Sequence, residues 1–340
     1  MKITINNQEI EVTGQDTLLV ELQRLGIHIP TLCYSKQQKH VASCMVCMVK
    51  NVATGQMIPS CSVRPTEGMC IDTDSAEVRE MRKTALELLL SDHRADCEAP
   101  CTQVCSRGLD VAQLLLFYDR GQFAQAKALL NANSNSNVNA NLNANPDSLT
   151  RRLVDSTPVS FCHECKAPCE KACRRRTIDS AVSIRQIIVQ VESMDVLPIK
   201  VDGMTADKQA FCSRLGRYNE AERQRMKESY DTPTRCLHCA CEGRSKCKLR
   251  PLATEAGIKS IPFGVSSAAP VKEQIRVGQR LVFEPAKCIH CGLCVYNTQD
   301  GFTFQHRGFN MQVVIPETSK ANVPDEIAEI CPTGALYVES

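Results

Sequence analysis

The chain has no tryptophan, and aromatic residues make up only 4% of it. It also lacks any apolar stretch near the roughly 20 residues that a membrane-spanning helix needs. The nearest candidates are residues 88–90 and 114–117, so we expect no direct membrane insertion. A formal net charge of +2 gives no reason to expect a nucleic-acid partner, which would need a clustered basic face.

Sequence motifs for several cofactors are absent as well. There is no G-x-G-x-x-G run to open a dinucleotide-binding domain, no P-loop and no G-x-S-x-G turn. None of the close cysteine pairs is followed by the histidine that attaches a c-type haem. We therefore expect no flavin on this chain, and we expect it to be non-catalytic by itself.

Cysteine, by contrast, is abundant, with 21 residues. Disulfide frameworks are typical of short secreted chains, and this chain of 340 residues opens with a predicted strand, Met1–Ile5, instead of a secretory leader. Nineteen of the cysteines fall into four groups with the spacing of iron–sulfur ligands. Such thiolates need a reducing compartment, so we expect a cytoplasmic protein. Cys70 and Cys212 lie outside the groups and are predicted to be small buried apolar residues.

Two of the groups are simple sets of four thiolates. The first has the spacing C-x10-C-x2-C-x13-C and suits one [2Fe–2S] cluster; its members are Cys33, Cys44, Cys47 and Cys61. The fourth has the close spacing and the remote Cys-Pro of bacterial ferredoxins and suits one [4Fe–4S] cubane; its members are Cys288, Cys291, Cys294 and Cys331.

The second group has seven cysteines and one histidine, enough for two cubanes. Its members are His93, Cys97, Cys101, Cys105, Cys162, Cys165, Cys169 and Cys173. The spacing leaves open how these eight residues divide between the two clusters. It also leaves open whether His93 is a ligand or only caps the C-terminal end of a helix.

The third group has four cysteines within twelve residues, Cys236, Cys239, Cys241 and Cys247. We favour a cubane here because of the other cluster motifs in the chain. Zinc is the alternative, since four thiolates also close a tetrahedral zinc site. Together the groups predict one [2Fe–2S] and about four [4Fe–4S] clusters.

Local patterns predict several elements. Alternation over residues 2–6 and 9–13 around Asn6-Asn7 predicts a hairpin. A helix should follow, with Asp16 as N-cap, residues 18, 22 and 25 on the core face and Gly26 as its end. Amphipathic spacing predicts helices over residues 75–91, 110–119, 122–130 and 184–191. Residues 206–230 are charged and helix-prone, and we interpret them as a solvated helix face.

A resemblance to a known family rests on three segments: GIHIPTLCY at residues 26–34, CMVCMV at 44–49 and PSC at 59–61. They are similar to the β-grasp plant-type ferredoxin domain that opens the large iron–sulfur subunit of respiratory complex I and of many NAD-linked formate dehydrogenases and hydrogenases. That family continues with a cubane motif, H-x3-C-x2-C-x5-C. Here the match to it stops after His93 and Cys97.

Two further segments carry resemblances. Residues 162–174 and 178–182, CHECKAPCEKACR and IDSAV, resemble the helical two-cubane domain of glutamate synthase small subunit and dihydropyrimidine dehydrogenase. From about Leu281 the chain resembles the C-terminal ferredoxin module of the complex I and formate dehydrogenase relatives. Relatives with two cubanes have a cysteine where this chain has Thr298, so this module should hold one.

The resulting fold prediction is an α+β multidomain protein. A β-grasp [2Fe–2S] domain should span residues 1–74, and a helical two-[4Fe–4S] domain with a flexible loop at 131–149 should span 75–205. A charged helix and cysteine-rich segment should occupy 206–280, and an α+β ferredoxin-like domain 281–340.

By resemblance, the chain is predicted to be a multi-cluster electron-transfer subunit of a cytoplasmic hetero-oligomeric oxidoreductase. Its partners would be a flavoprotein subunit that reacts with NAD(P)H and a second catalytic subunit of formate dehydrogenase, hydrogenase or glutamate-synthase type. Two alternatives stay open: an iron–sulfur or zinc scaffold or redox-sensing protein, and an oxidoreductase complete in itself that recruits flavin without a recognisable motif.

Overall fold

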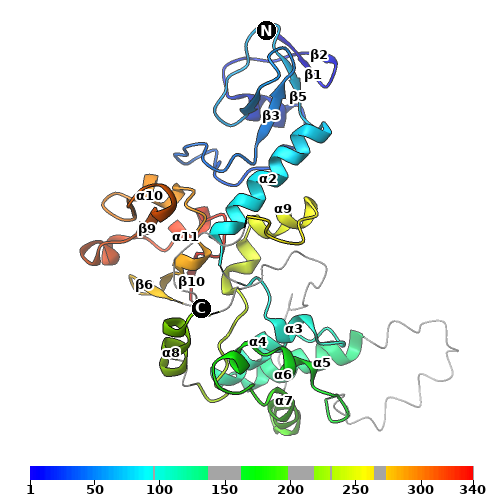
Figure 1. Ribbon diagram of the computed structural model, residues 1–340, viewed down its shortest axis with the longest axis vertical. Coiled ribbons are helices and arrows are strands. Elements are labelled where there is room, and N and C mark those ends of the chain that lie inside the picture. Colours follow the sequence, from blue (N-terminus) through cyan, green and yellow to red (C-terminus); the bar gives the residue numbers. More distant parts are fainter. Residues whose placement is uncertain (95, 137–161, 198–217, 230–231, 264–272, 340) are drawn as a thin grey trace, which may run out of the picture. The chain divides into compact units, whose positions relative to one another are not determined.

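The computed structural model describes residues 1–94, 96–136, 162–197, 218–229, 232–263 and 273–339 (Figure 1). They form two compact units. The first unit contains the described residues of 1–95 and 242–340, and the second contains those of 96–241. The predicted N-terminal and C-terminal domains therefore share one unit, while the predicted domain boundaries stay predictions.

A five-stranded sheet opens the first unit, in the order β2-β1-β5-β3-β4. Its strands are β1 (Lys2–Ile5), β2 (Gln8–Glu11), β3 (Met48–Asn51), β4 (Met57–Pro59) and β5 (Cys70–Asp72). The pairing is antiparallel except between β1 and β5. The predicted hairpin is confirmed, because Asn6 and Asn7 have φ of 49° and 68° between β1 and β2. Positive φ at both central residues is what a tight hairpin turn requires.

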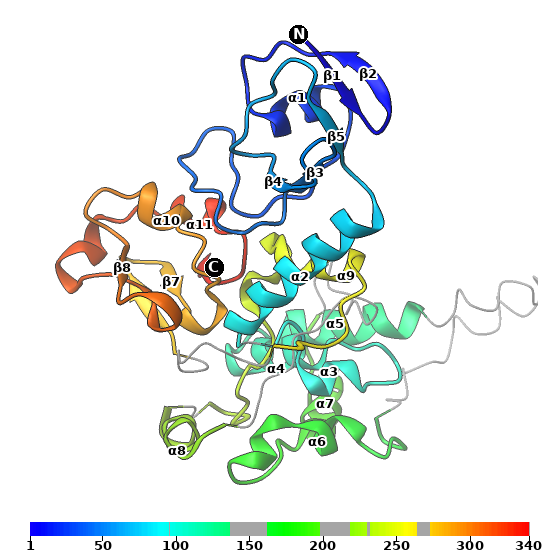
Figure 2. The same ribbon diagram turned by 45° about the horizontal axis from the view of Figure 1, so that its top comes forward.

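Helix α1 (Leu18–Arg24) lies against this sheet (Figure 2). The predicted helix is confirmed, but its N-cap is Thr17 and not Asp16. The predicted core face is wrong at Leu25, which is 38% exposed, while Leu19 is fully buried. The helix ends at Arg24, so residue 25 no longer follows the helical period.

Helix α2 (Ala76–Asp92) leads away from the sheet and packs against β3 and α9 (Leu249–Glu255) (Figure 1). The Ser75 hydroxyl caps it by accepting a hydrogen bond from the Val78 N–H. Apolar residues of the first cysteine loop, α2, α9 and the fourth cysteine group form one core cluster: Leu32, Val46, Leu86, Leu90, Leu249, Ala253, Ile258 and Ile289. This core holds the first and fourth groups in one unit.

The rest of the first unit consists of short elements. Its strands are β6 (Ile275–Val277), β7 (Leu281–Phe283), β8 (Thr303–Gln305), β9 (Gln312–Val314) and β10 (Leu336–Val338). Its α-helices are α10 (Leu293–Tyr296) and α11 (Ile327–Ile330), and its 3-10 helices are η4 (Glu242–Lys246), η5 (Pro285–Lys287), η6 (Gly308–Asn310) and η7 (Glu317–Asn322). An antiparallel sheet of order β10-β7-β6 and a β8–β9 hairpin enclose a core around Phe283 and Phe302.

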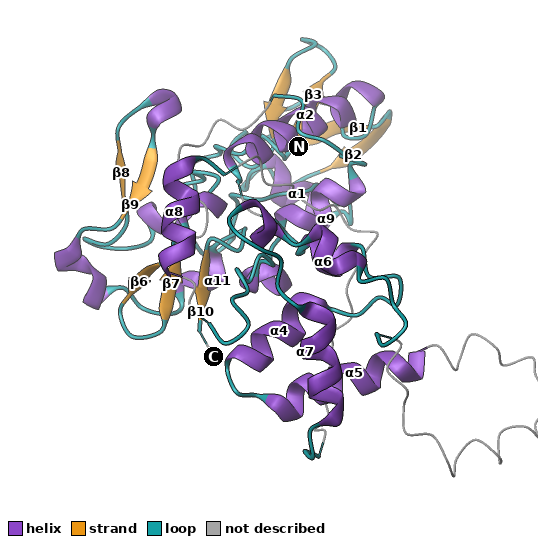
Figure 3. Ribbon diagram, turned by 60° about the horizontal axis from the view of Figure 1, so that its bottom comes forward, coloured by secondary structure: helices purple, strands orange, loops and turns teal. Residues whose placement is uncertain are grey.

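The second unit is helical in its described residues (Figure 3). Its elements are α3 (Pro100–Gln103), α4 (Val111–Asp119), α5 (Phe123–Ser136), α6 (Pro168–Ala172), η3 (Arg174–Thr177), α7 (Ile184–Ser193) and α8 (Glu220–Ser229). Three of the predicted helices are confirmed as α4, α5 and α7, with Gly121 at φ 69° between the first two.

The asparagine-rich tract departs from its prediction as a loop. Helix α5 continues to Ser136, so residues 131–136 are helical, whereas residues 137–149 lie outside the described part. Of the predicted charged helix, α8 is described and residues 206–217 are not. No helix among the described residues has the length and apolar character needed to cross a bilayer.

Candidate metal centres

The four cysteines of the first group are all buried, at 1–3% exposure. Strands β3 and β4 position two of them, because Met48 pairs with Pro59 and so brings Cys47 and Cys61 to the same end of the hairpin. The Ser60 hydroxyl donates to the Cys47 carbonyl at 2.7 Å and fixes this end. Cys33 and Cys44 come from the loop between α1 and β3.

These thiols interact in two pairs. A hydrogen bond from Cys44 lowers the pKa of Cys33 to about 5, and one from Cys61 lowers the pKa of Cys47 to about 6. In each pair the donating thiol has its pKa raised, chiefly by that same bond and then by burial. Thiolates placed this close together away from water are stabilised when a metal binds them, since a coordinating thiol is deprotonated outright.

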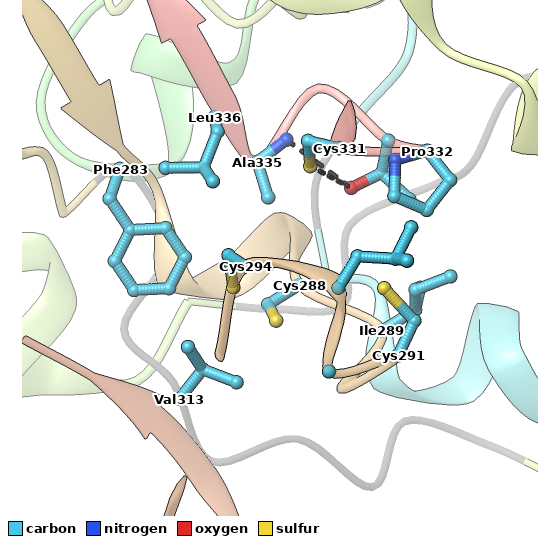
Figure 4. Close-up of a pocket in the computed structure, with 13 residues that line it drawn as sticks. Phe283, Cys288, Ile289, Cys291, Cys294, Val313, Cys331, Pro332, Ala335 and Leu336 are labelled. Atoms are coloured by element: carbon cyan, nitrogen blue, oxygen red, sulfur yellow. Dashed lines mark hydrogen bonds between the residues drawn. The ribbon is translucent and has the colours of Figure 1, made fainter. Parts of the chain in front are cut away.

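The fourth group lines a cavity of about 350 Å³ (Figure 4). Cys288 and Cys291 come from the loop that leads into α10, Cys294 lies in α10 itself, and Cys331 is the C-cap residue of α11. Burial raises the pKa of the first three thiols. The other side chains around them are mostly apolar: Phe283, Ile289, Leu293, Val313, Pro332, Ala335 and Leu336. Four thiols from two segments therefore line one pocket, as cubane ligands do.

Backbone N–H groups point at these sulfurs. The His290 N–H lies 3.4 Å from the Cys288 Sγ, and the Leu293 N–H donates to Cys291. Both donors follow from left-handed backbone, with φ of 52° at His290 and 79° at Gly292. A Cβ at position 292 would also lie 2.9 Å from Tyr296 Cε2, so glycine is needed there. Such donors stabilise negative charge on thiolates and tune the potential of a cluster.

The first group also has a backbone N–H that points at a cysteine sulfur after a residue in left-handed backbone. The Val46 N–H donates to the Cys44 sulfur, and Met45 between them has a φ of 54°. Methionine in left-handed backbone is strained. The recurrence at Cys44, Cys288 and Cys291 indicates loops shaped around anionic sulfur.

The loops of the first and fourth groups touch one another. The Ser43 hydroxyl donates to the Cys291 carbonyl at 3.1 Å. The Asn297 side chain bonds the Lys39 backbone twice, accepting from its N–H at 3.0 Å and donating to its carbonyl at 2.8 Å. Ser43 precedes the predicted ligand Cys44, and Cys291 is itself a predicted ligand. The hydrogen bond between them therefore connects the two sites.

In the second unit, four cysteines line a cavity of about 330 Å³. They are Cys101, Cys173, Cys236 and Cys239. Burial raises the pKa of Cys101, and repulsion from Cys236, Cys239, Cys173 and Cys169 adds to the rise. The sequence placed these residues in two different groups, because spacing along the chain does not report which loops meet.

Other cysteines of this unit form neighbouring pairs. The pKa of Cys169 is raised to about 11, mainly by burial, with further contributions from the charges of Glu170, Cys105 and Cys165. The Cys165 N–H donates to the Cys162 carbonyl at 3.3 Å, and the Cys241 N–H donates to the Cys97 carbonyl at 3.2 Å.

The predicted third group is divided between the units. Cys236, Cys239 and Cys241 belong to the second unit and Cys247 to the first, where it packs against the core cluster that contains Leu249. Across the described residues, no three His, Cys, Asp or Glu side chains converge as the ligands of a lone metal ion would.

His93 and two non-ligand cysteines complete the predicted set. His93 is buried and is the C-cap residue of α2. Its predicted position at a helix end is therefore confirmed, and its ligand role stays a prediction. Cys70 is only half-buried on β5, not fully buried as expected, and Cys212 lies outside the described residues.

An interaction between His238 and Asp119, next to the cavity of the second unit, was not predicted. His238 Nε2 lies 2.9 Å from a carboxylate oxygen of Asp119, and the His238 N–H donates to the Cys236 Sγ at 3.3 Å. Burial acts to lower the pKa of His238, but bonds to Asp119 and Cys236 outweigh it and raise the pKa to about 9. No sequence pattern marks this pair, since its members lie 119 positions apart in the chain.

The N-terminal region of the chain matches a known protein family. Residues 1–76 match the family described as 2Fe-2S iron-sulfur cluster binding domain. The predicted [2Fe–2S] character of the N-terminal region is thereby confirmed.

Several relatives are similar over about a third of the chain. A subunit of the NADH-quinone oxidoreductase of Rhizobium meliloti (strain 1021) is 32% identical over 36% of this chain and 14% of its own length. The HndD subunit of the NADP-reducing hydrogenase of Solidesulfovibrio fructosivorans is 39% identical over 28% and 17%. The 75 kDa subunit of NADH-ubiquinone oxidoreductase from Reclinomonas americana is 28% identical over 37% and 18%. The chain thus spans less than a fifth of these relatives.

A solved structure, described as NAD+-reducing [NiFe]-hydrogenase in the H2-reduced state, is similar in fold. The similarity covers 100% of this chain and 87% of that one, with a TM-score of 0.50 and 15% sequence identity. At that identity the likeness concerns the fold alone. The resemblance to complex I and hydrogenase iron–sulfur subunits is confirmed by the relatives in sequence.

Proposed function

We propose that the chain is a multi-cluster iron–sulfur subunit that relays single electrons inside a cytoplasmic oxidoreductase complex. The observation that carries this proposal is the contact between the two cysteine sites of the first unit. A [2Fe–2S] domain and a cysteine-lined cavity are joined there through Ser43 and Cys291, 3.1 Å apart. An isolated carrier needs one such site, whereas a relay needs sites that exchange electrons with one another.

The residues fit the groups they would hold. Thiolates of the first group would bind one [2Fe–2S] cluster and those of the fourth group one [4Fe–4S] cluster, with the remaining predicted ligands serving further cubanes. Each cluster supplies a one-electron couple when bound. The protein's own part is to exclude water through apolar walls and to set each potential with N–H donors such as those of Val46, His290 and Leu293.

The relatives support a proposal for the partners. Subunits of NADH-quinone oxidoreductase and of NADP-reducing hydrogenase match this chain. We therefore place a flavoprotein that reacts with NAD(P)H at one end of the relay, and a second redox enzyme of hydrogenase, formate dehydrogenase or glutamate-synthase type at the other.

Intramolecular electron sharing tests this function. Anaerobically purified chain would be photoreduced with less than one electron per molecule and frozen at increasing times, and the [2Fe–2S] and [4Fe–4S] EPR signals would be integrated. We expect the electron to be shared between both signals. Replacing Ser43 and Asn297 together with alanine should slow the sharing severalfold, because it removes the bonds between the two loops.

The matched control is Ser193→Ala, which removes a hydroxyl that donates to the Gln190 carbonyl of its own helix at 2.8 Å. It should leave the sharing rate unchanged, and iron content should be equal in all three proteins. An electron that stays on whichever cluster was reduced first, in the parent chain, would overturn the relay.

A further inference from the structure

We propose that Cys101, Cys173, Cys236 and Cys239 together bind one [4Fe–4S] cluster, a ligand set assembled from three segments of the second unit. The proposal rests on the proposed function, since it assigns one station of the relay. Its basis is that these four thiols line one cavity of about 330 Å³. The sequence groups, in contrast, assigned Cys236 and Cys239 to a different cluster from Cys101 and Cys173.

The surroundings of the cavity suit a cubane. The walls are largely apolar and come from α3, α4, α7 and the loops beside them: Ala99, Pro100, Ala112, Leu115, Val182, Ile184 and Leu237. Two cations, Arg174 and Arg175, also line it. Each is also paired with a carboxylate, Arg174 with Asp96 at 3.2 Å and Arg175 with Asp179 at 2.8 Å. A cluster with four thiolate ligands is an anion, and guanidinium groups are attracted to it.

Backbone donors point at the sulfurs here as they do in the first unit. The His238 N–H lies 3.3 Å from Cys236 Sγ, with His238 at a φ of 46°. Backbone N–H groups of Val182, Arg175 and Arg176 donate to the Cys173 sulfur. The loop at Cys236 therefore has the form already found at Cys288, where the N–H of a left-handed residue two positions later points at the sulfur.

The segment that supplies Cys236 and Cys239 is fixed to the helices independently of any cluster. The Thr234 N–H and hydroxyl both donate to Asp119 at the end of α4, at 2.8 and 2.6 Å. The Arg175 guanidinium donates to the Arg235 carbonyl at 3.3 Å, and Arg235 in turn pairs with Asp179. The two cysteines are therefore held over the cavity by residues that are not ligands.

A lone zinc ion fits this cavity less well than a cluster does. Zinc draws four sulfurs to about 2.3 Å from one point, and no such convergence of three ligands occurs in the described part of the chain. Cubane ligands instead stand around a core of four iron and four sulfide atoms. Four thiols spread around a cavity match the second arrangement.

Paired substitutions test which thiols share a cluster. Cys101→Ser and Cys239→Ser should each remove about four irons per chain, and the double variant should remove no more than either one, since a cubane holds four irons. Cys239→Ser with Cys247→Ser should remove about eight. Iron and sulfide would be measured together with Mössbauer spectra, and Cys70→Ser is the control that keeps all iron.

The opposite pattern would overturn the proposal. If Cys239 and Cys247 belong to one cluster, their double variant loses about four irons, and Cys101 with Cys239 loses about eight. Should Cys239→Ser fail to fold, Cys239→Asp and Cys101→Asp, which keep a ligand, should each change the Mössbauer signature of the same single cubane. A parent chain without iron would refute the proposed function itself, whereas full iron with the wrong pairing refutes only this ligand set.

Discussion

Replacing Cys44 with serine is expected to abolish the [2Fe–2S] EPR signal and leave the cubane signals in place. Cys44 is 3% exposed and interacts directly with Cys33. A serine hydroxyl keeps its proton at neutral pH where a thiol bound to iron loses it, so the cluster would lose one of four anionic ligands. The measurement is low-temperature EPR with iron analysis, which should show about two irons fewer per chain.

Cys70→Ser is the matched control for that experiment. Cys70 lies on β5 of the same sheet. The contact that the structure shows for its sulfur is with the Gly68 carbonyl oxygen, at 3.8 Å. Its substitution should leave every signal unchanged. An unaltered [2Fe–2S] spectrum in Cys44→Ser would remove the first group from the relay.

Lys287→Met is expected to destabilise the C-terminal part of the first unit by about 3–5 kcal/mol, because it removes one partner of a buried ion pair. The Lys287 ammonium lies 2.7 Å from Glu284, and both side chains are 2% exposed. Hydrogen exchange of residues 281–338 in increasing urea would measure the loss. Cys288 follows Lys287 directly, so the fourth site should also lose iron more readily.

The double variant Glu284→Gln with Lys287→Met separates charge from packing. It removes both charges and should recover most of the lost stability, since a neutral buried pair has no unpaired ion to desolvate. If Lys287→Met is as stable as the parent, or if the double variant is worse than the single one, the buried pair has no such role.

Much of the local structure could be predicted because it depends on neighbouring residues. The hairpin at Asn6-Asn7 and the helices α2, α4 and α7 all follow from short patterns. The N-cap of α1 could not be decided in this way, because Asp16 and Thr17 are both good caps. Burial of Leu18, Leu19 and Leu22 together fixes the register at Thr17.

The partition of the cysteines shows where spacing stops being informative. Cys288, Cys291 and Cys294 lie within seven consecutive residues at the start of α10, so their spacing already predicts one site. Cys236 and Cys239 have the same close spacing, yet the other thiols of their cavity come from α3 and the end of α6. Only the packing of α3 against α6, and of both around residues 236–239, brings those thiols together.

The number of predicted ligands still allows the predicted number of clusters. One cubane at the fourth group and one at the proposed site leave eight of the predicted ligands outside the first group. By number these suffice for two more. The chain should then carry one [2Fe–2S] and four [4Fe–4S] clusters, or about 18 irons.

The most direct test of the account is therefore metal, sulfide and flavin content per chain in anaerobically purified protein. A relay predicts about 18 irons with matching sulfide, and neither zinc nor flavin. About 14 irons with one zinc would mean that one of the predicted cubanes is instead a structural zinc site. Stoichiometric flavin would mean that the chain is an oxidoreductase in its own right. The zinc result would contradict the predicted number of clusters, and the flavin result would contradict a chain that only carries electrons.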